Sequence, residues 1–554
     1  MVNKLFKYFS TRLSIGDKMD VKYLVREIEK LPNIQKISAG KLEKLAKKYG
    51  RKTEFKNYNF STSVRHRSAN LTVIIGSERV RQKNLNERQK EILRNLDKTL
   101  ERVKSYLKKV PVVMVERRMG QNDIFSPKCV LFTSVYKEEF VRLPFMFSVS
   151  YFDPRGHTQD TLYTIAIPEW KEEDRQILVF PEDGITFILG SDYYGEIKKS
   201  FLRMGMWAAK QKGMLGIHAG AKIIRAKDIY GAVRRYGMLL FGLTATGKTT
   251  HTCHNHGLDK PGEGVEIVQD DVVFWRKDGS ALGTEKGFFI KTDGLDSEAQ
   301  RLLREAATKK GAVFENVMVD YRGRVHFSDD TLTGNGRGVI QRDDLGKYKH
   351  KTVDIPPLNE LDGLIILFIT RRNTILPIIS KLTPEQAAAA FMLGESVESS
   401  GGDPRRAGES VRVVGTNPFI IGDFAEEGNR FYEFVKANGQ KIQCYLMNTG
   451  AVGEIMVKKK DGTKEIRQKG EKIKIEDNAA IIRAIARGTI EWKKDDYFNV
   501  LVPARVDDMD ITRFDIRKYY TKDMIKKLVN DLIKERKDYI RKFKKLRKEI
   551  VKSF

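Results

Sequence analysis

The sequence predicts an α/β protein of two domains, on three observations. The chain has 554 residues, well above the ~100–200 residues of one domain. Short apolar runs typical of strands alternate with amphipathic stretches typical of helices. From about residue 214 the pattern becomes strand, glycine-rich turn and helix. We therefore expect an N-terminal α/β domain over 1–213, a second α/β domain over 214–554, and an active-site cleft between them.

The N-terminal domain should contain a long helix followed by strands. Asn86 suits an N-cap, and apolar residues over 86–108 recur at helical spacing. Residues 111–190 contain the short apolar and aromatic runs VPVVMV, CVLFTSVY and FMFSVSYF, separated by Pro- and Gly-containing turns. Such runs predict strands.

The second domain shows buried strands and two clear helical stretches. YGMLLFG, EIVQDDVVFW and GLIILFIT, at 236–242, 266–275 and 363–370, are typical of buried strands. LTPEQAAAAFMLG predicts a helix capped by Thr383 and stopped by Gly394. Residues 521–551 predict a basic amphipathic helix, for which we favour a packing role with a solvated basic face over a nucleic-acid arm.

Composition restricts the possible partners. The formal charge is +28, from 101 Lys plus Arg against 73 Asp plus Glu, which attracts polyanions in general. The charge is spread along the chain, so nucleic-acid binding is not the main function we expect. Three cysteines without C-x-x-C spacing predict no disulfide framework and a reducing, cytoplasmic location. We find neither an apolar run of ~18 residues nor a signal-peptide core, so we expect no membrane association.

A complete phosphate-binding motif follows the strand at 236–242. The motif G-x-x-x-x-G-K-[ST] is met in full and is followed by Thr250; its residues are Gly242, Leu243, Thr244, Ala245, Thr246, Gly247, Lys248 and Thr249. Glycines let the backbone N–H groups approach phosphate oxygens. Lys248 would neutralise the β- and γ-phosphates of ATP, and the Thr249 hydroxyl would bind Mg²⁺. Asp270 and Asp271, inside an apolar run, suit the acidic partner that such a loop requires.

Several further motifs occur in the order found in one enzyme family. The loop GLTATGKTT resembles GLSGTGKTT of the ATP-type phosphoenolpyruvate carboxykinases. YYGEIKKS and GIHAGA precede it in family order, and QDD, GFFIKT, FENVMVD, TGNGR, LPIISKLTPEQAAAAF, VGTNPF and MNTGAVG follow it. This collinear likeness covers roughly residues 180–500. The resemblance implies the two-domain fold of that family, with a P-loop domain and an active-site cleft.

The resemblance also implies a reaction and a metal site. The family decarboxylates oxaloacetate and phosphorylates the resulting enolate with ATP, which yields phosphoenolpyruvate, ADP and CO₂. Its transition metal, usually Mn²⁺, is held by a lysine, a histidine and an aspartate, which correspond here to Lys198, His218 and Asp271. A lysine binds metal only as the neutral amine, and the adjacent Lys199 is consistent with a lowered pKa. Asp270 is carried over as a catalytic carboxylate.

Other positions carry over as binding residues. Lys291 and Arg337 match family positions that place positive charge near the γ-phosphate and the enolate, and Lys199 and Arg337 would also bind substrate. Tyr193 matches a substrate-site tyrosine. Arg67 resembles an arginine that binds the substrate carboxylate, with Arg65 as a competitor for that role.

The chain departs from the family at several motifs. Ala245, Gly334 and Ala451 replace a glycine, an acid and an aromatic residue. The segment that contacts the nucleotide base has lost its arginine and reads NAAII at 478–482, and the S-G-Y-T segment reads LGESVES at 393–399. These departures leave open a kinase of the same fold that phosphorylates another small acid or hydroxyl substrate. A nucleic-acid-stimulated ATPase ranks last.

A group of histidines follows the loop. His251, His254 and His256 stand at i, i+3 and i+5. They could bind a metal, but we favour a helix with exposed histidines. The sequence leaves the oligomeric state, the choice between ATP and GTP, and the physiological direction open.

Overall fold

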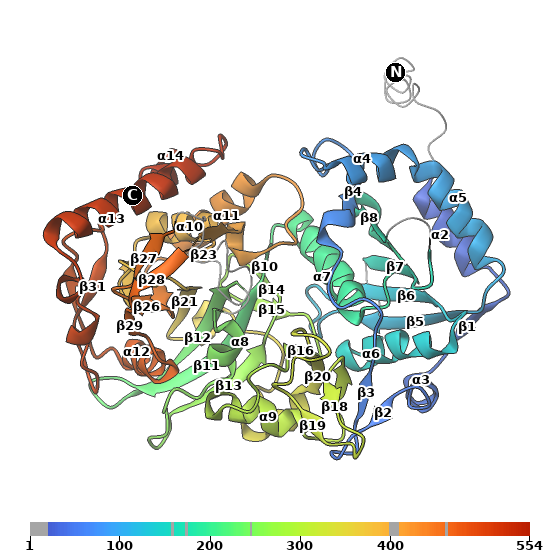
Figure 1. The fold of residues 1–554 in the computed structure, drawn as a ribbon, viewed down its shortest axis with the longest axis horizontal. Coiled ribbons are helices and arrows are strands. Elements are labelled where there is room, and N and C mark those ends of the chain that lie inside the picture. The colour runs from blue at the N-terminus through green and yellow to red at the C-terminus, as the bar shows by residue number, and fades with distance from the viewer. Residues whose placement is uncertain are drawn as a thin grey trace.

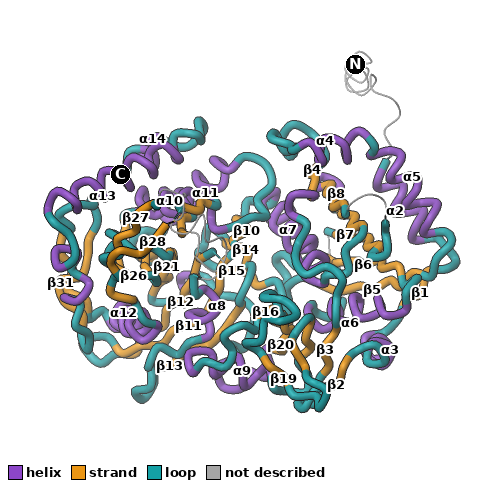
Figure 2. Tube along the Cα trace, in the orientation of Figure 1, coloured by secondary structure: helices purple, strands orange, loops and turns teal. Residues whose placement is uncertain are grey.

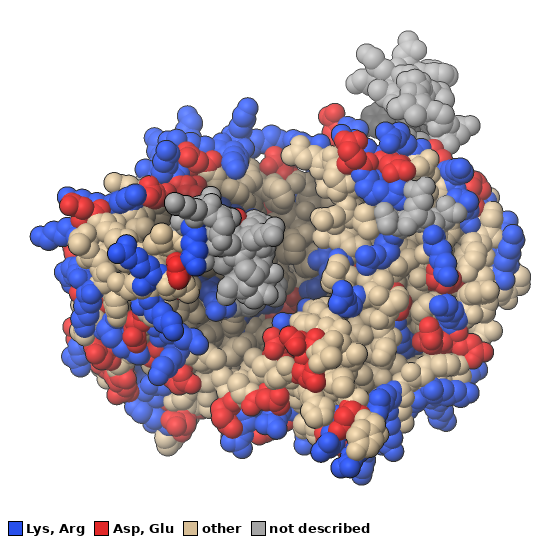
Figure 3. Space-filling model, viewed as in Figure 1, with Lys and Arg blue, Asp and Glu red and all other residues tan. Residues whose placement is uncertain are grey.

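A computed structural model describes residues 20–156, 160–171, 175–243, 246–397, 409–459 and 464–553. The chain forms two lobes, with the N-terminal residues in one and most of the later strands in the other (Figure 1). Strands lie inside both lobes and helices cover much of their outer faces (Figure 2). The face drawn in Figure 3 is hollowed where the lobes meet. None of the described helices is both long and apolar enough to span a bilayer.

The N-terminal lobe is built on a seven-stranded mixed sheet with the strand order β1-β5-β6-β7-β9-β8-β4. Its strands are β1 (Ile34–Lys36), β4 (Thr72–Ile74), β5 (Val112–Arg118), β6 (Lys128–Ser134), β7 (Thr161–Ile167), β8 (Gln176–Phe180) and β9 (Ile185–Leu189). Its helices are α2 (Val21–Glu29), α3 (Ala39–Ala46), α4 (Glu87–Arg94), α5 (Leu96–Leu107), α6 (Arg142–Ser150) and α7 (Tyr194–Gln211).

The second lobe centres on an eight-stranded sheet with the order β13-β11-β12-β21-β25-β22-β31-β30. Its strands are β11 (Ala219–Lys227), β12 (Val233–Gly242), β13 (Gly264–Gln269), β21 (Gly363–Thr370), β22 (Ile379–Leu382), β25 (Ile442–Asn448), β30 (Ile490–Lys494) and β31 (Leu501–Val506). Its helices are α8 (Lys248–Cys253), α10 (Pro384–Leu393), α11 (Phe424–Ala437), α12 (Ile475–Arg487), α13 (Lys522–Ile540) and α14 (Lys548–Val551).

A five-stranded sheet, β16-β20-β17-β3-β2, combines segments far apart in the chain. It contains β2 (Arg51–Lys52), β3 (Tyr58–Phe60), β16 (Gly287–Lys291), β17 (Val313–Glu315) and β20 (Arg337–Gln341), with α9 (Arg301–Ala307) close to β20. A three-stranded sheet joins β10 (Leu215–Ile217), β14 (Val273–Trp275) and β15 (Ala281–Gly283). The domain division at 213/214 stays a prediction.

Four two-stranded ribbons complete the described strands. They pair β18 (Met318–Val319) with β19 (Val325–His326), β23 (Glu395–Val397) with β24 (Ser410–Arg412), β26 (Ala451–Val452) with β29 (Glu471–Lys472), and β27 (Ile455–Lys458) with β28 (Lys464–Gln468). All four pairs are antiparallel.

The parallel strands β12, β21 and β25 form the centre of the second lobe. Every residue of β21 is buried. Because side chains alternate across a sheet, Leu364, Ile366 and Phe368 pack into one core, whereas Ile365 and Leu367 pack into another on the opposite face. Burial on both faces explains the uninterrupted apolar run in the sequence, and the strand predicted at 363–370 is confirmed.

Helix ends follow the predicted signals in two places. Asn86 caps α4 with a full capping box, and Thr383 does the same for α10. Gly394 ends α10 in the left-handed region at φ 45°. The predicted helix over 86–108 is interrupted at Asn95, where α4 ends and α5 begins.

Three predictions of secondary structure need correction. FMFSVSYF lies largely in the buried helix α6, because an apolar run without periodicity fits a buried helix as well as a strand. EIVQDDVVFW is two strands, since β13 ends before Asp270 and β14 begins after Asp271. The C-terminal stretch is two helices, α13 and α14, with Ile525, Leu532 and Ile550 buried as its packing role requires.

Candidate active site

The candidate site is centred on the carboxylate of Asp271, in the turn between β13 and β14. Its Oδ2 lies 2.6 Å from Lys198 Nζ and also contacts Lys199 Nζ. Its Oδ1 lies 2.9 Å from His218 Nε2 and 3.6 Å from Lys248 Nζ. These contacts hold the pKa of Asp271 well below its usual range, although burial opposes them. One buried carboxylate thus gathers three lysines and a histidine from three other segments of the chain.

The two adjacent lysines near the start of α7 differ in their surroundings. Lys198 is fully buried, and its Nζ also lies 3.2 Å from the carboxylate of Glu285. Desolvation alone would lower the pKa of Lys198, but its two carboxylate partners prevail and raise it. Lys199 has Asp271 as its ion-pair partner, and burial lowers its pKa to about 7. Of the two, Lys199 is therefore the one closer to a neutral amine at neutral pH.

His218 lies between β10 and β11 with each ring nitrogen engaged. Its Nδ1 lies 2.7 Å from the carbonyl oxygen of Thr416, so Nδ1 carries a proton and donates to that carbonyl. Burial, followed by the charge of Lys248, lowers the pKa of His218 to about 4. At neutral pH the ring therefore directs the lone pair of Nε2 at Asp271. Two facing lone pairs repel unless a cation lies between them, and this arrangement fits a shared metal ion.

The phosphate-binding loop starts at the end of β12 and places Lys248 beside the acidic pair. Lys248 Nζ donates to the backbone carbonyl of Asp270 at 2.8 Å. The Thr249 hydroxyl donates to Asp270 Oδ2 at 3.3 Å, and the buried Asp270 Oδ1 has no hydrogen-bond partner among the described residues. Burial raises the pKa of Asp270. An oxygen pair of this kind, next to a hydroxyl, suits Mg²⁺.

The rest of the loop is held by the carboxyl end of the parallel strands. Gly242 is the last residue of β12 and Leu243 follows it, whereas Thr244 and Ala245 lie outside the described residues. Gly247 takes φ 96°, a conformation open to glycine, just before α8 begins with Lys248. The Thr449 hydroxyl, after β25, donates to the carbonyl of Thr246 at 2.9 Å. Thr250 lies in the first turn of α8.

Two of the predicted cations lie opposite each other on the β16–β20 ladder. Lys291 pairs in register with Arg337. Arg337 lies 5.7 Å from the centroid of the Phe289 ring, and Lys198 lies 5.5 Å from the same centroid. Lys291 pairs with Asp293 at 3.0 Å, and its side chain is 38% exposed. The structure thus places Arg337 and Lys198 around the same aromatic ring and gives Lys291 a separate partner.

Tyr193 and Arg67 have different neighbours in the site. Asn335 donates to the Tyr193 hydroxyl at 3.4 Å and also binds Arg337, so Tyr193 belongs to the Arg337 side of the site. The guanidinium of Arg67 stacks 4.5 Å from the Phe419 ring centroid. Arg65, its competitor in the sequence, is exposed. The geometry therefore favours Arg67 for a substrate carboxylate.

Two side chains that contact the candidate residues were not identified from the sequence. Phe419 lies within 6.0 Å of three cations and an imidazole, namely Arg67, Lys199, Arg203 and His218. Glu285 is a buried partner of Lys198. Phe419 is the last residue of the motif VGTNPF, so the sequence marked its position but did not predict its contacts. No local motif marked Glu285.

The three histidines after the loop are not an exposed group, so that prediction was wrong. His251 and His256 are buried, and His254 is partly buried. They surround the buried amine of Lys222, which donates to the carbonyl of His251 and contacts His256 Nε2. Only His251 belongs to α8, which packs against β11 and β12, whereas His254 and His256 follow the end of that helix. No group of three or more His, Cys, Asp or Glu suited to a metal occurs among the described residues.

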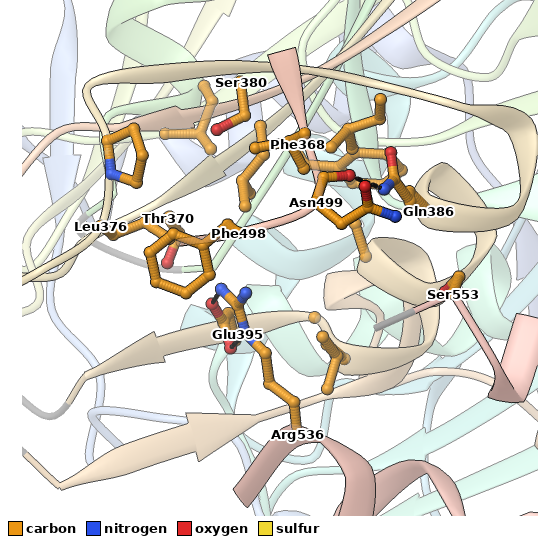
Figure 4. Close-up of a pocket in the computed structure, with 18 of the residues that line it drawn as sticks. Phe368, Thr370, Leu376, Ser380, Gln386, Glu395, Phe498, Asn499, Arg536 and Ser553 are labelled. Atoms are coloured by element: carbon orange, nitrogen blue, oxygen red, sulfur yellow. Dashed lines mark hydrogen bonds and ion pairs between the residues drawn. The ribbon is translucent and has the colours of Figure 1, made fainter. Parts of the chain in front are cut away.

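A separate cavity of about 70 Å³, with Thr416 in its wall, is mostly apolar. Figure 4 shows Arg536 reaching Glu395 on one side of it, while Gln386 contacts the carbonyl of Asn499 on another. Glu395 belongs to LGESVES, a departure from the family; the last two residues of that segment, Glu398 and Ser399, lie outside the described residues. The charges of this cavity are paired with each other, so we do not assign it to catalysis.

Comparisons with known proteins identify the family of the chain. A family model described as phosphoenolpyruvate carboxykinase matches residues 33–512, further toward the N-terminus than the motifs alone. A protein of Aeropyrum pernix named phosphoenolpyruvate carboxykinase (ATP) is 31% identical over 442 residues, which cover 79% of this chain and 82% of that protein. Proteins of the same name from Rhizobium leguminosarum and Alkaliphilus oremlandii are 27% and 28% identical, over 57% and 62% of their own lengths and 60% and 65% of this chain. The chain belongs to the ATP-type phosphoenolpyruvate carboxykinase family.

Proposed function

We propose that the protein converts oxaloacetate and ATP to phosphoenolpyruvate, ADP and CO₂. The observation that carries this proposal is the convergence on Asp271 of Lys198, Lys199, His218 and the P-loop residue Lys248. Phosphoryl transfer to an enolate needs concentrated positive charge between a triphosphate and a small acid. We place the protein in the cytoplasm, in keeping with three buried, free cysteines.

For the metal we propose Mn²⁺ held by Lys199, His218 and Asp271. The resemblance placed Lys198 in this set, but Lys198 is held as an ammonium between two carboxylates, whereas burial lowers the pKa of Lys199 to about 7. A bound Mn²⁺ would act as a Lewis acid on the enolate oxygen. The Thr249 hydroxyl and Asp270 would hold Mg²⁺ with the nucleotide.

The remaining residues bind and orient the reactants. Lys248 would turn from Asp270 and Asp271 to the phosphates once ATP enters, because a triphosphate is the stronger anion. Arg67 would bind a substrate carboxylate as a bidentate fork, supported by Phe419. Arg337 would neutralise charge on the transferred phosphoryl group.

The test is an assay of the purified protein with oxaloacetate, Mn²⁺ and either ATP or GTP, following ADP or GDP and phosphoenolpyruvate. We expect turnover with ATP, and a loss of about a thousandfold or more in Lys248→Ala, as for removal of a principal charge-stabilising group. Lys109→Ala, an exposed lysine just after α5, is the control and should keep full activity. Oxaloacetate that is not consumed with ATP and Mn²⁺ refutes the proposal. The comparisons give no support to a different acceptor.

A further inference from the structure

A cavity of about 280 Å³ outside the active site is strongly basic. It lies where the loops after β5 and α6 meet the ends of β16 and β20, and six cations line it: Arg118, Arg155, Lys286, Arg342, Lys349 and Lys351. The carboxylates in its wall belong to Asp153 and Asp343. The cavity is thus lined by three cations for each carboxylate.

Both of these carboxylates already have cationic partners. Asp343 Oδ1 lies 2.8 Å from Lys349 Nζ, and Asp153 Oδ1 lies 3.7 Å from Nη1 of Arg117, which is not part of the wall. Within the described parts of the chain, Arg118, Lys286 and Arg342 have no carboxylate at ion-pair distance. Carboxylates of the described residues therefore do not balance the positive charge of the cavity by ion pairs.

Arg342 makes this imbalance costly. The residue is 7% exposed, its Nη2 donates to the carbonyls of His350 and Thr352, and its buried Nε has no acceptor among the described residues. Burial lowers the pKa of this guanidinium to about 10. Arg118 likewise donates to the backbone carbonyls of Gly120 and Arg155. Asp343 and Asp354 attract the Arg342 guanidinium only from beyond ion-pair distance, and burial outweighs them. Because a desolvated charge with weak compensation is unfavourable, a diffusible anion would stabilise this wall.

We propose that this cavity binds a small oxyanion carrying two or more negative charges, either a phosphate compound or a polycarboxylate. Both classes present several ionised oxygens, which guanidinium and ammonium groups bind with charge-assisted hydrogen bonds. The volume of about 280 Å³ suits a small metabolite with a few carbon or phosphorus atoms and is too small for a folded protein partner.

The cavity is connected to the active site by a short piece of backbone. Lys286 lines the cavity, and the preceding residue, Glu285, contacts Lys198 at 3.2 Å. Lys286 is followed by the β16–β20 ladder, in which Gly287 pairs with Gln341 at the cavity end. Lys291 pairs with Arg337 at the other end of this ladder. The two ends are about 13 Å apart at ~3.3 Å per residue. An anion that bridges Lys286 and Arg342 would fix the cavity end of both strands and alter the placement of Lys198 and Arg337.

Direct binding tests the site without relying on the proposed function. Metal-free protein carrying Lys248→Ala, which weakens anion binding at the P-loop, is titrated calorimetrically with pyrophosphate and, separately, with citrate. We expect one of the two to bind, which also distinguishes phosphate from carboxylate recognition. Adding Lys286→Gln and Lys351→Gln should weaken that binding about tenfold or more, because two cations leave a partly desolvated site. The charge-matched control, Lys108→Gln with Lys109→Gln on the far end of α5, should leave it unchanged.

Equal affinity in the cavity variant and in the control, or no binding of either anion at millimolar concentration, overturns the site. The connection has its own test in the protein with Lys248 intact. At constant free Mn²⁺ and saturating ATP, the anion that binds should change the KM for oxaloacetate, and Lys286→Gln with Lys351→Gln should abolish that change while leaving kcat without the anion within about twofold. An identical response in that variant overturns the connection and leaves the proposed reaction untouched.

Discussion

Replacement of Asp271 by asparagine tests the centre of the site. The amide has nearly the same shape as the carboxylate, but the substitution removes the negative charge that is shared by Lys198, Lys199, His218 and Lys248. Lys198 retains Glu285 at 3.2 Å. Lys199 and Lys248 lose the one carboxylate within ion-pair distance that the described residues provide. The substitution thus leaves buried positive charge without compensation.

The magnitude follows from that loss. Breaking a buried ion pair by removing one partner costs about 3–5 kcal/mol. We expect the free energy of Mn²⁺ binding to weaken by a similar amount, because the same carboxylate would be a ligand of the ion. At 1.36 kcal/mol per tenfold change, the affinity for Mn²⁺ should then fall by a factor of about 10²–10⁴. We expect kcat/KM for oxaloacetate to fall by at least the same factor.

The measurements are a Mn²⁺ titration followed by electron paramagnetic resonance and steady-state turnover of oxaloacetate with ATP. Asp278→Asn is the matched control, because Asp278 is exposed and pairs with Arg276 at 2.7 Å. A surface pair contributes about 0–1 kcal/mol, so both quantities should stay close to those of the unchanged protein. An Asp271→Asn protein that is folded and keeps its Mn²⁺ affinity and turnover within about threefold would refute the reasoning.

Three further predictions follow from individual contacts. Phe419→Leu removes a ring that packs against Arg67 and Lys199. Because the lost cation–π contacts are worth about 1–2 kcal/mol, the KM for oxaloacetate should rise about 5–30-fold while the KM for ATP changes little. Equal effects on both KM values would contradict the assignment. Burial lowers the pKa of Lys199 to about 7, so its amine is neutral above that pH. The affinity for Mn²⁺ should therefore rise as the pH increases through about 7. A Lys199→Met protein that keeps this pH dependence would contradict the role of Lys199 as a ligand. Glu395→Gln should lower the free energy of unfolding in urea by about 3–5 kcal/mol with kcat nearly unchanged. Because contacts with buried arginines hold the pKa of Glu395 well below its usual range, its contribution is present above its unfolded pKa of ~4.3 and is lost as the pH falls further; a variant as stable as the unchanged protein at neutral pH would contradict this.

The sequence predicted local structure best where local interactions determine it. Thr383 and Gly394 delimit α10 as predicted, because caps and breakers act on their own backbone. The continuous apolar run of β21 identified a strand buried on both faces. The same rule failed for α6, since an apolar run of about eight residues contains no periodicity that separates a buried helix from a buried strand.

The departures from the family are partly explained by packing. In LGESVES, Glu395 is buried among Arg372, Arg412 and Arg536 at 3.4, 2.8 and 3.1 Å, so this segment carries a structural ion-pair cluster. The NAAII segment lies in α12, which packs against β11, and Asn478 is buried there. Such roles depend on neighbours distant in the chain, and no local motif reveals them.

The sequence by itself determined the phosphate-binding loop, the acidic pair after β13 and the residue types from which a cation site can be built. These features are contiguous, and their spacing carries the chemistry. Only the tertiary structure decided which lysine faces two carboxylates, that Glu285 and Phe419 belong to the site, and that the histidines after the loop are buried. The physical reason is that pKa, burial and ion pairing depend on distances between groups that the chain brings together only when its sheets assemble.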